Sequence, residues 1–454
     1  LSIEIIAIRV FTPIIWTNSI STSIILWVIL LALSYWYYVW WKISNWKDSI
    51  YLVKRIILNL IIASSYYLFL TFIFDVSLLN FLLEKLNSYF FAILLSSFLL
   101  FFIPVFFASQ TIPLLSEVLK WENTWEKIWK LLFYSTIWSF LGSVMTSSVL
   151  FASIWVSKSG TLNSLILAWI SLLLSFVYFK KIKYFHIISM FLVLLTLSIL
   201  SAENLKSVLF EKSNSYQNIQ VYDLWDWRRV FSLNGWYSSW INLQTKESFF
   251  SYIQEIKQKI VQEKYKNIAI IWAAWFTLPY ELSIRKDISN VDVIDVDPDL
   301  KEIAEKYFLE ENLNDKVKFI PESARFFINK TIKENKKYDN VVIDVYIWKS
   351  LPAQALTYEF FNDLTKISDS IFLNIITDRD LKSDFSKKVL NTMFEAFWDV
   401  YYKDVNAYSN LSDKTNFVIS NKYFEWYKKW EKDELFPFYT DDKNSIEMDL
   451  FRMD

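Results

Sequence analysis

The chain has 454 residues, a formal net charge of −1 and no cysteine. This near-neutral charge gives no support to a nucleic-acid-binding surface, and the missing cysteines exclude disulfides, thiolate nucleophiles and cysteine metal sites. The single histidine, His186, lies in a lysine-rich junction before an apolar run and is interpreted as a membrane-interface residue. Ser-His-Asp triads and histidine-based metal sites are therefore excluded, no metal is expected, and acid–base chemistry must come from Asp, Glu, Lys or Tyr.

Tryptophan is abundant and glycine almost absent, with 22 Trp against three Gly. Ordinary glycine usage of about 7% would give roughly 32 in a chain of this length. Our hypothesis is that many of these tryptophans are encoded by UGA codons that the cell reads as glycine. The alternative is an unusually aromatic membrane half, because Trp is enriched at bilayer interfaces. That alternative accounts for Trp36, Trp40 and Trp41 but not for Trp272.

Residues 1–202 are dominated by apolar runs and are predicted to form an all-α transmembrane bundle. About 20 residues are needed to cross the hydrocarbon core of a bilayer. Residues 1–15 are predicted as one more, shorter helix, which gives about six to seven spans. The other candidate spans are 20–41, 49–74, 88–112, 131–156, 161–179 and 187–202.

Basic clusters at 42–55 and 180–183 predict that the loops after the second and sixth spans are cytoplasmic. A full crossing from residue 187 would then carry the C-terminal half to the outer face. Either that segment is re-entrant or interfacial, or the basic-loop rule fails here. We expect a multi-pass cell-membrane protein whose catalytic half is cytoplasmic. Gln110, beside an apolar run, either marks a pathway or hydrogen-bonds a neighbouring helix.

A polar linker is expected over 203–215, and 216–246 is predicted to be a small β-hairpin region, with Asn234-Gly235 as a strong hairpin signal. Residues 247–454 then alternate between strands and helices, which indicates a mostly parallel, doubly wound, Rossmann-like α/β domain. The predicted strands are 267–271, 291–295, 317–320, 338–344, 370–376 and two near 400 and 416–420. The predicted helices include 246–264, 298–313, 324–333, 358–367 and 381–397.

Ligands of doubly wound sheets bind outside the carboxyl ends of the strands. The first of these strands runs into the turn Trp272-Ala273-Ala274-Trp275, where a nucleotide cradle needs bare amides and φ > 0. Asp295 ends the next strand, about 20 residues later, a spacing that suits a carboxylate on a ribose diol. Asp344 ends the fourth strand. Helix caps or solvated strand ends are the alternatives, but three such positions in register favour a nucleoside-containing cofactor.

From Tyr216 to about Ser420, the chain resembles the spermidine synthase (polyamine aminopropyltransferase) family, which has the S-adenosylmethionine methyltransferase fold. The matching motifs are Tyr216-Gln217-Asn-Ile, Leu233-Asn-Gly235, the strand and turn ending at Thr277, Asp295-Val-Asp-Pro298, Ser323-Ala-Arg325, Tyr338-Asp to Asp344, and Leu356-Thr-Tyr-Glu-Phe-Phe361. The apolar half resembles the multi-span region that precedes this domain in membrane-bound bacterial members. Glycine at positions 40, 41, 138, 272 and 275 would improve these matches.

The resemblance implies a role for each matching position. Gln217 would contact the sulfur-bearing chain of decarboxylated S-adenosylmethionine or S-adenosylmethionine, Asp295 its ribose hydroxyls, and Ser323 and Ala324 its adenine. Asp344 would be the general base for a small-molecule amine acceptor. The resemblance leaves the oligomeric state open, a homo-oligomer included.

The amine side departs from the family pattern. The family usually has a second Asp after the fourth strand, where this chain has Ile347, and a Tyr-His pair where it has Tyr252-Ile253. Ser238 replaces a usual Gln, and Ser323 a usual Asp. A polycation without acidic partners carries a large desolvation cost, so the acceptor need not be putrescine. Three functions stay open: a membrane-bound aminopropyltransferase, a membrane-bound methyltransferase, or a non-catalytic nucleoside-binding transport or scaffold protein.

Overall fold

The structure is a computed structural model, and the part of the chain that it describes has gaps. The described residues are 2–15, 19–43, 49–73, 81–82, 85–86, 88–118, 124–150, 156–179, 183–201, 208–214, 216–224, 227–233, 236–272, 276–344, 353–406, 414–446 and 449–450. They form two compact units. The first comprises Leu1–Lys206 and Ser213–Gln217, and the second Ser207–Lys212 and Asn218–Asp454.

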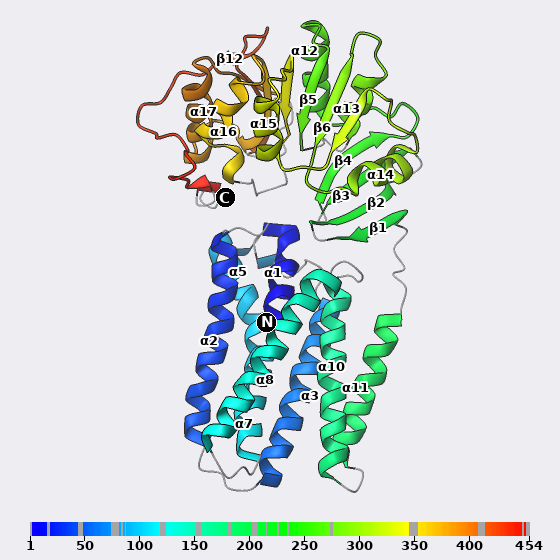
Figure 1. The fold of residues 1–454 in the computed structure, drawn as a ribbon, viewed down its shortest axis with the longest axis vertical. Helices are drawn as coiled ribbons and strands as arrows, with labels where there is room; N and C mark the ends of the chain where they lie inside the picture. The colour runs from blue at the N-terminus through cyan, green and yellow to red at the C-terminus, as the bar shows by residue number, and fades with distance from the viewer. Residues whose placement is uncertain are drawn as a thin grey trace. The chain divides into compact units, whose positions relative to one another are not determined.

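The first unit is mainly helical over its described residues up to Ser201, as the apolar runs predict (Figure 1). Between α5 and α6 the helix widens into a π-helical segment, η1, directly before Pro104. Proline has no N–H to donate to the carbonyl four residues back, which explains the local change of hydrogen-bonding pattern. The elements are α1 (Ser2–Ile15), α2 (Ser19–Ile43), α3 (Ser49–Ile73), α5 (Tyr89–Ser97), η1 (Phe98–Phe102), α6 (Ile103–Ser109), α7 (Thr111–Val118), α8 (Thr124–Val144), η2 (Met145–Leu150), α10 (Val156–Tyr178) and α11 (Tyr184–Ser201).

Polar side chains link the helices of this unit. The hydroxyls of Ser64 on α3 and Ser164 on α10 each donate to the other residue's backbone carbonyl, at 2.8 and 2.7 Å. Asn59 on α3 donates to the side-chain carbonyl of Gln110 at 2.7 Å, and both residues are buried. Such bonds hold apolar helices together where water is absent. The expectation that Gln110 hydrogen-bonds a neighbouring helix is therefore confirmed.

Three stretches of the described residues are long and apolar enough to cross a membrane: Ser49–Phe69, Phe90–Val118 and Ser159–Tyr178. Ile20–Tyr35 and Tyr184–Ile199 are shorter apolar helices. A bundle of six to seven spans thus stays a prediction.

The second unit begins with a four-stranded sheet in the order β1-β2-β3-β4. Its strands are β1 (Phe210–Ser213), β2 (Asn218–Leu224), β3 (Arg228–Leu233) and β4 (Trp236–Asn242). Leu233 pairs with Trp236, so β3 and β4 form the predicted hairpin, although Asn234 and Gly235 lie outside the described residues. Strand β1 was not predicted, because it lies in the polar stretch 203–215, where a linker was expected.

An eight-stranded sheet forms the centre of the second unit, in the order β12-β10-β11-β9-β8-β5-β6-β7. Strands β7, β6, β5, β8 and β9 are parallel, and β11 and β10 add antiparallel pairs at one side. The sheet is therefore mixed, although the doubly wound part is as predicted. The strands are β5 (Asn267–Ile271), β6 (Asn290–Ile294), β7 (Val317–Ile320), β8 (Asn340–Ile343), β9 (Ile371–Asp378), β10 (Tyr401–Asp404), β11 (Lys414–Ser420) and β12 (Lys428–Lys429).

Helices cover both faces of this sheet, because successive strand residues point to opposite sides. Ile270, Val342 and Phe372 face a core shared with α12 (Ser251–Gln262), α13 (Thr277–Ser283), α14 (Leu300–Ile303) and η4 (Ala304–Leu309). Ile271, Ile343 and Leu373 face a second core shared with α15 (Ala324–Lys333), α16 (Tyr358–Thr365) and α17 (Asp384–Phe397), which lie together in Figure 1. After β5 the chain builds β6 and β7 on one side and then returns to β8 on the other side. The topological switch point is thus between β5 and β8.

Candidate active site

Strand register brings four residues together at the carboxyl edge of the sheet. Ile271 pairs with Ile294 on one side and with Ile343 on the other, and Ile343 pairs with Leu373. The residues that directly follow these four paired residues therefore lie side by side at the same edge, in the order Asp295, Trp272, Asp344, Asn374. Asp295 and Asp344 flank the turn after β5, at the place where doubly wound sheets bind ligands.

Asp344 is buried, with an exposed fraction of 6%. The Tyr252 hydroxyl of α12 donates to its Oδ2 at 2.9 Å, and Nδ2 of Asn374 donates to its Oδ1 at 2.8 Å. Burial raises the pKa of Asp344 to about 6, and the hydrogen bonds from Asn374 and Tyr252 oppose that rise. At neutral pH this carboxylate is thus mostly ionised yet able to accept a proton.

Tyr252 is a donor in this arrangement. Burial, and then the charge of Asp344, raises the pKa of Tyr252 well above its ordinary value. The phenol therefore stays protonated and fixes one oxygen of the carboxylate. In the sequence Tyr252 stands out only as part of a departure from the family pattern, whereas the hydrogen bond places it beside Asp344.

Asp295 is also buried, and its Oδ1 accepts the backbone N–H of Asp297 at 3.1 Å. Burial raises the pKa of Asp295 to about 7, and the neighbouring charge of Asp297 adds to the rise. A buried carboxylate at a strand end suits the hydroxyl donors of a ribose diol. Part of its bonding capacity therefore serves the local turn, whereas the N-cap residue of the next helix, α14, is Asp299.

The turn after β5 begins in the left-handed backbone region. Trp272 has φ = 66°, and its N–H donates to the carbonyl of Ile294 at 2.8 Å. Phe276, the residue before α13, has φ = 60°. The expectation of positive φ at position 272 is confirmed, and the Trp272 ring lies 6.2 Å from that of Phe360. Ala273, Ala274 and Trp275 lie outside the described residues.

The remaining predicted cofactor residues do not belong to the four strand-end positions. Ser323 caps α15 by accepting the N–H of Phe326 at 3.4 Å, and Ala324 is the first residue of that helix. Gln217 is buried and belongs to the segment Ser213–Gln217, which groups with the first unit. Ile347 lies outside the described residues.

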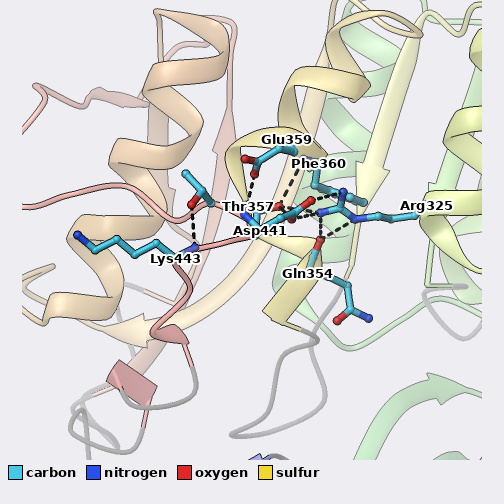
Figure 2. Close-up of polar contacts among 8 residues, drawn as sticks. Arg325, Gln354, Thr357, Glu359, Phe360, Asp441 and Lys443 are labelled. Atoms are coloured by element: carbon cyan, nitrogen blue, oxygen red, sulfur yellow. Dashed lines mark hydrogen bonds and ion pairs between the residues drawn. The ribbon is translucent and has the colours of Figure 1, made fainter.

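Arg325, next to Ala324, ties three segments together (Figure 2). Its guanidinium donates to the carbonyl of Gln354 and to the hydroxyl of Thr357, both at 2.8 Å. It also binds both carboxylate oxygens of Asp441, and the Thr357 hydroxyl donates to Asp441 at 2.7 Å. The C-terminal segment thereby holds the start of α16 against α15, beside the predicted adenine side of the site.

No family model matches the chain. The curated polyamine aminopropyltransferase of Vibrio vulnificus is 24% identical over 172 residues, which cover 36% of this chain and 56% of that protein. The match thus spans little more than half the length of that relative.

Three solved structures are similar at low identity. A probable spermidine synthase from Corynebacterium glutamicum has a TM-score of 0.40 and 19% identity, over 49% of this chain and 82% of that one. The spermidine synthase from Thermotoga maritima has a TM-score of 0.37 and 15% identity, over 52% and 82%. A spermidine synthase in complex with the transition-state analogue AdoDATO has a TM-score of 0.35 and 15% identity, over 52% and 82%. All of these proteins bear the names of the family that the sequence motifs resemble.

Proposed function

We propose that this chain is a membrane-attached, spermidine synthase-like transferase that alkylates an amine. Decarboxylated S-adenosylmethionine is the proposed alkyl donor, and Asp344 is the proposed general base. The observation that carries the proposal is the Asp344 carboxylate at the switch point, buried, hydrogen-bonded on both oxygens and able to exchange a proton near neutral pH. The likeness to a curated polyamine aminopropyltransferase supports the same reaction class.

The proposed reaction forms one bond and breaks another. The lone pair of a neutral amine attacks the carbon next to the sulfonium, a C–N bond forms, and the C–S electron pair leaves with the sulfur. The products are the alkylated amine and neutral methylthioadenosine. Asp344 accepts the proton that the nitrogen loses. The protein aligns the two partners and keeps the amine in its neutral form.

In this proposal the nucleoside lies along the strand ends. Asp295 accepts hydrogen bonds from the ribose, the turn from Trp272 to Trp275 supplies backbone amides, and Ser323 and Ala324 border the adenine. Gln217 contacts the sulfur-bearing chain. The left-handed φ of Trp272 and the burial of Asp295 support the first two assignments.

A bilayer is the proposed environment of the first unit. Three apolar helices of sufficient length, and the hydroxyl and amide bonds between them, support that proposal. The full number of spans, the domain boundaries at 202, 215 and 246, and the cytoplasmic side of the catalytic half belong to the proposal as well.

The test is turnover by the full chain in detergent or lipid nanodiscs. Decarboxylated S-adenosylmethionine and a panel of amines should yield methylthioadenosine, detected by chromatography. Production of S-adenosylhomocysteine from S-adenosylmethionine instead would establish the methyltransferase alternative. Calorimetric binding of a nucleoside without any product would favour the non-catalytic alternative and contradict the proposal.

The wild-type enzyme should lose activity in acid. With the nucleoside saturating, kcat should rise with pH through a midpoint near 6, because only the ionised Asp344 accepts a proton. The contribution of Asp344 to the free energy of unfolding changes with pH in the direction opposite to kcat. The raised folded-state pKa means that protonation favours the folded state, so this group lowers the free energy of unfolding as pH rises from about 4 to about 6. A kcat independent of pH between 5 and 8 would contradict the assignment of Asp344 as base.

We also propose that several tryptophans are glycines in the cell. Three of the nine non-glycine residues with positive φ, among the described residues, are Trp272, Trp398 and Trp426, with φ of 66°, 68° and 71°. Trp398 follows the last residue of α17, where a left-handed glycine commonly ends a helix. The side chains of Trp398 and Trp426 are 74% and 78% exposed, so burial does not explain an indole at either position. Glycine masses at these positions in peptides from the native cell would establish the recoding, and UGG codons would exclude it.

Replacing the two exposed tryptophans with glycine should stabilise the protein. Trp398→Gly and Trp426→Gly should each raise the free energy of unfolding by about 1 kcal/mol, because a left-handed backbone costs other residues about 1–2 kcal/mol and glycine loses part of that gain to its unfolded-state entropy. Denaturant melts of the full chain measure the effect. Trp240, on β4 with an ordinary φ, is the matched control, and Trp240→Gly should destabilise. Destabilisation by all three substitutions would contradict the strain argument.

A further inference from the structure

Three asparagine side chains form a hydrogen-bonded row that ends on Asp344. Nδ2 of Asn406 donates to Oδ1 of Asn416 at 3.3 Å, and Nδ2 of Asn416 donates to Oδ1 of Asn374 at 3.1 Å. Nδ2 of Asn374 then donates to Oδ1 of Asp344 at 2.8 Å. The row runs from the half-buried Asn406 and Asn416 to Asn374, which is only 1% exposed.

Strand register explains why these residues meet. Asn374 follows Leu373, the partner of Ile343, and so lies beside Asp344. On the other side of β9, Val418 pairs with Asn374, which makes Asn416 its diagonal neighbour. Asn374 is two residues from Phe372, and Asn416 is two residues from Val418. Side chains two residues apart in a strand point to the same face, so both asparagines face the side of the sheet that α12 and Tyr252 cover.

The end of the row fixes the direction of every amide. An ionised carboxylate only accepts hydrogen bonds, so Asn374 must turn its NH₂ toward Asp344. Its carbonyl then needs a donor, which Asn416 supplies, and the carbonyl of Asn416 takes its donor from Asn406. A lone buried Asn could present either end to a neighbour, whereas this row permits one orientation.

We propose that Asn374 is a positioning residue for Asp344, and that Asn416 and Asn406 hold its amide in the donating orientation. The inference rests on the proposed function, since it assigns the row to the base of that reaction. Asn374 and Tyr252 bind opposite oxygens of the carboxylate, so together they fix its plane. Ionised carboxylates have about four acceptor positions, so both oxygens keep capacity for an incoming N–H.

The charged groups on the surrounding elements have partners of their own. On α12, Glu255 pairs with Lys403 at 2.7 Å and lies near Lys259, and Lys257 pairs with Glu281 at 2.6 Å. Directly after β9, the Arg379 guanidinium lies 4.0 Å from the Asp404 carboxylate. Lys414, the first residue of β11, also has an interaction partner. Tyr252 is the titratable side chain that contacts Asp344 among the described residues, and it stays protonated. The Asn374 amide and the Tyr252 hydroxyl are therefore the neutral donors that favour the ionised form of the buried carboxylate, and both hydrogen bonds oppose the rise in the pKa of Asp344.

The test variant is Asn374→Leu, which keeps the approximate volume and removes the donor. With the nucleoside saturating, we expect the acid limb of kcat to move up by about one pH unit, from a midpoint near 6 to one near 7, since one hydrogen bond to the charged form shifts a pKa on that scale. The smaller ionised fraction should lower kcat at pH 7 about two-fold and kcat at pH 5 about ten-fold. KM for the nucleoside should change little. Asn416→Val should shift the limb in the same direction by less, because it removes only the support of the Asn374 amide.

The matched control is Asn340→Leu. Asn340 is a fully buried asparagine at the other end of β8, where its Nδ2 donates to Ser370 Oγ at 2.9 Å. The Asn340→Leu variant should have a lower free energy of unfolding but the same midpoint of the acid limb of kcat as the wild type. Equal pH profiles for Asn374→Leu and Asn340→Leu would overturn the proposal and reduce Asn374 to a structural residue.

A second readout needs no turnover. The difference in melting temperature between the wild-type chain and Asp344→Asn, followed from pH 4 to 8, reports the titration of Asp344. In the Asn374→Leu background that titration should move upward by about one pH unit. If the wild type makes no product but this shift is present, the proposed function fails while the positioning role stands. An unshifted titration overturns the positioning role whatever the activity.

Discussion

Asp344→Asn is expected to lower kcat by about 10²- to 10⁴-fold, the usual range for loss of a general base. The amide keeps the shape of the carboxylate but cannot accept the proton from the attacking amine. Binding of the sulfonium nucleoside should remain nearly unchanged, because the proposed cradle and Asp295 follow the neighbouring strands β5 and β6. Single-turnover formation of methylthioadenosine measures the loss, and calorimetry with decarboxylated S-adenosylmethionine measures the binding.

Asp292→Asn is the appropriate comparison. Asp292 is fully buried on β6 and hydrogen-bonded to Tyr338 and Lys336, yet it lies inside the strand, away from the carboxyl edge. Its substitution should destabilise the fold while kcat of the folded fraction stays close to that of the wild type. An Asp344→Asn variant that keeps full turnover would remove Asp344 from the mechanism as the base and require a different proton acceptor.

The two acidic residues at the strand ends were predictable because each directly follows a short, buried strand whose last residues are apolar. In a parallel sheet such strands are buried on both faces, so a carboxylate directly after one is confined to the edge where ligands bind. The periodicity also located β5, β7 and α15 with the observed bounds. Likewise, the left-handed backbone at Trp272 followed from the kind of turn that a nucleoside cradle requires.

Asn374 was not predicted as a site residue, because its proximity to Asp344 depends on strand order. Asp344 and Asn374 are 30 residues apart, and only the pairing of β8 with β9 makes them neighbours. A polar residue inside the buried run of β9 was the available signal. The antiparallel position of β11 between β9 and β10 was not predicted for the same reason. Local periodicity locates a strand but does not show whether it runs parallel or antiparallel to its neighbours.

The double variant Trp272→Gly/Trp275→Gly is expected to bind the adenosyl sulfonium about 10²-fold more tightly than the chain with tryptophan. In the proposed cradle the ligand is bound by backbone amides, which it can approach closely only where no side chain projects. Recovering two such hydrogen bonds at about 1–1.5 kcal/mol each accounts for a gain of that size. Calorimetry with decarboxylated S-adenosylmethionine on the full chain measures it.

Two comparisons separate side-chain bulk from backbone strain at this turn. Trp272→Ala removes the indole but keeps a Cβ at φ = 66°, so it should recover only part of the affinity that Trp272→Gly recovers. Trp398→Gly relieves a left-handed tryptophan at the end of α17 and should change stability without changing affinity. If the double variant binds no more tightly than Trp398→Gly does, the turn after β5 is not a nucleoside cradle. In that case Asp295 also loses its proposed ribose partner, because the proposal places the backbone amides of this turn and the Asp295 carboxylate against the same nucleoside.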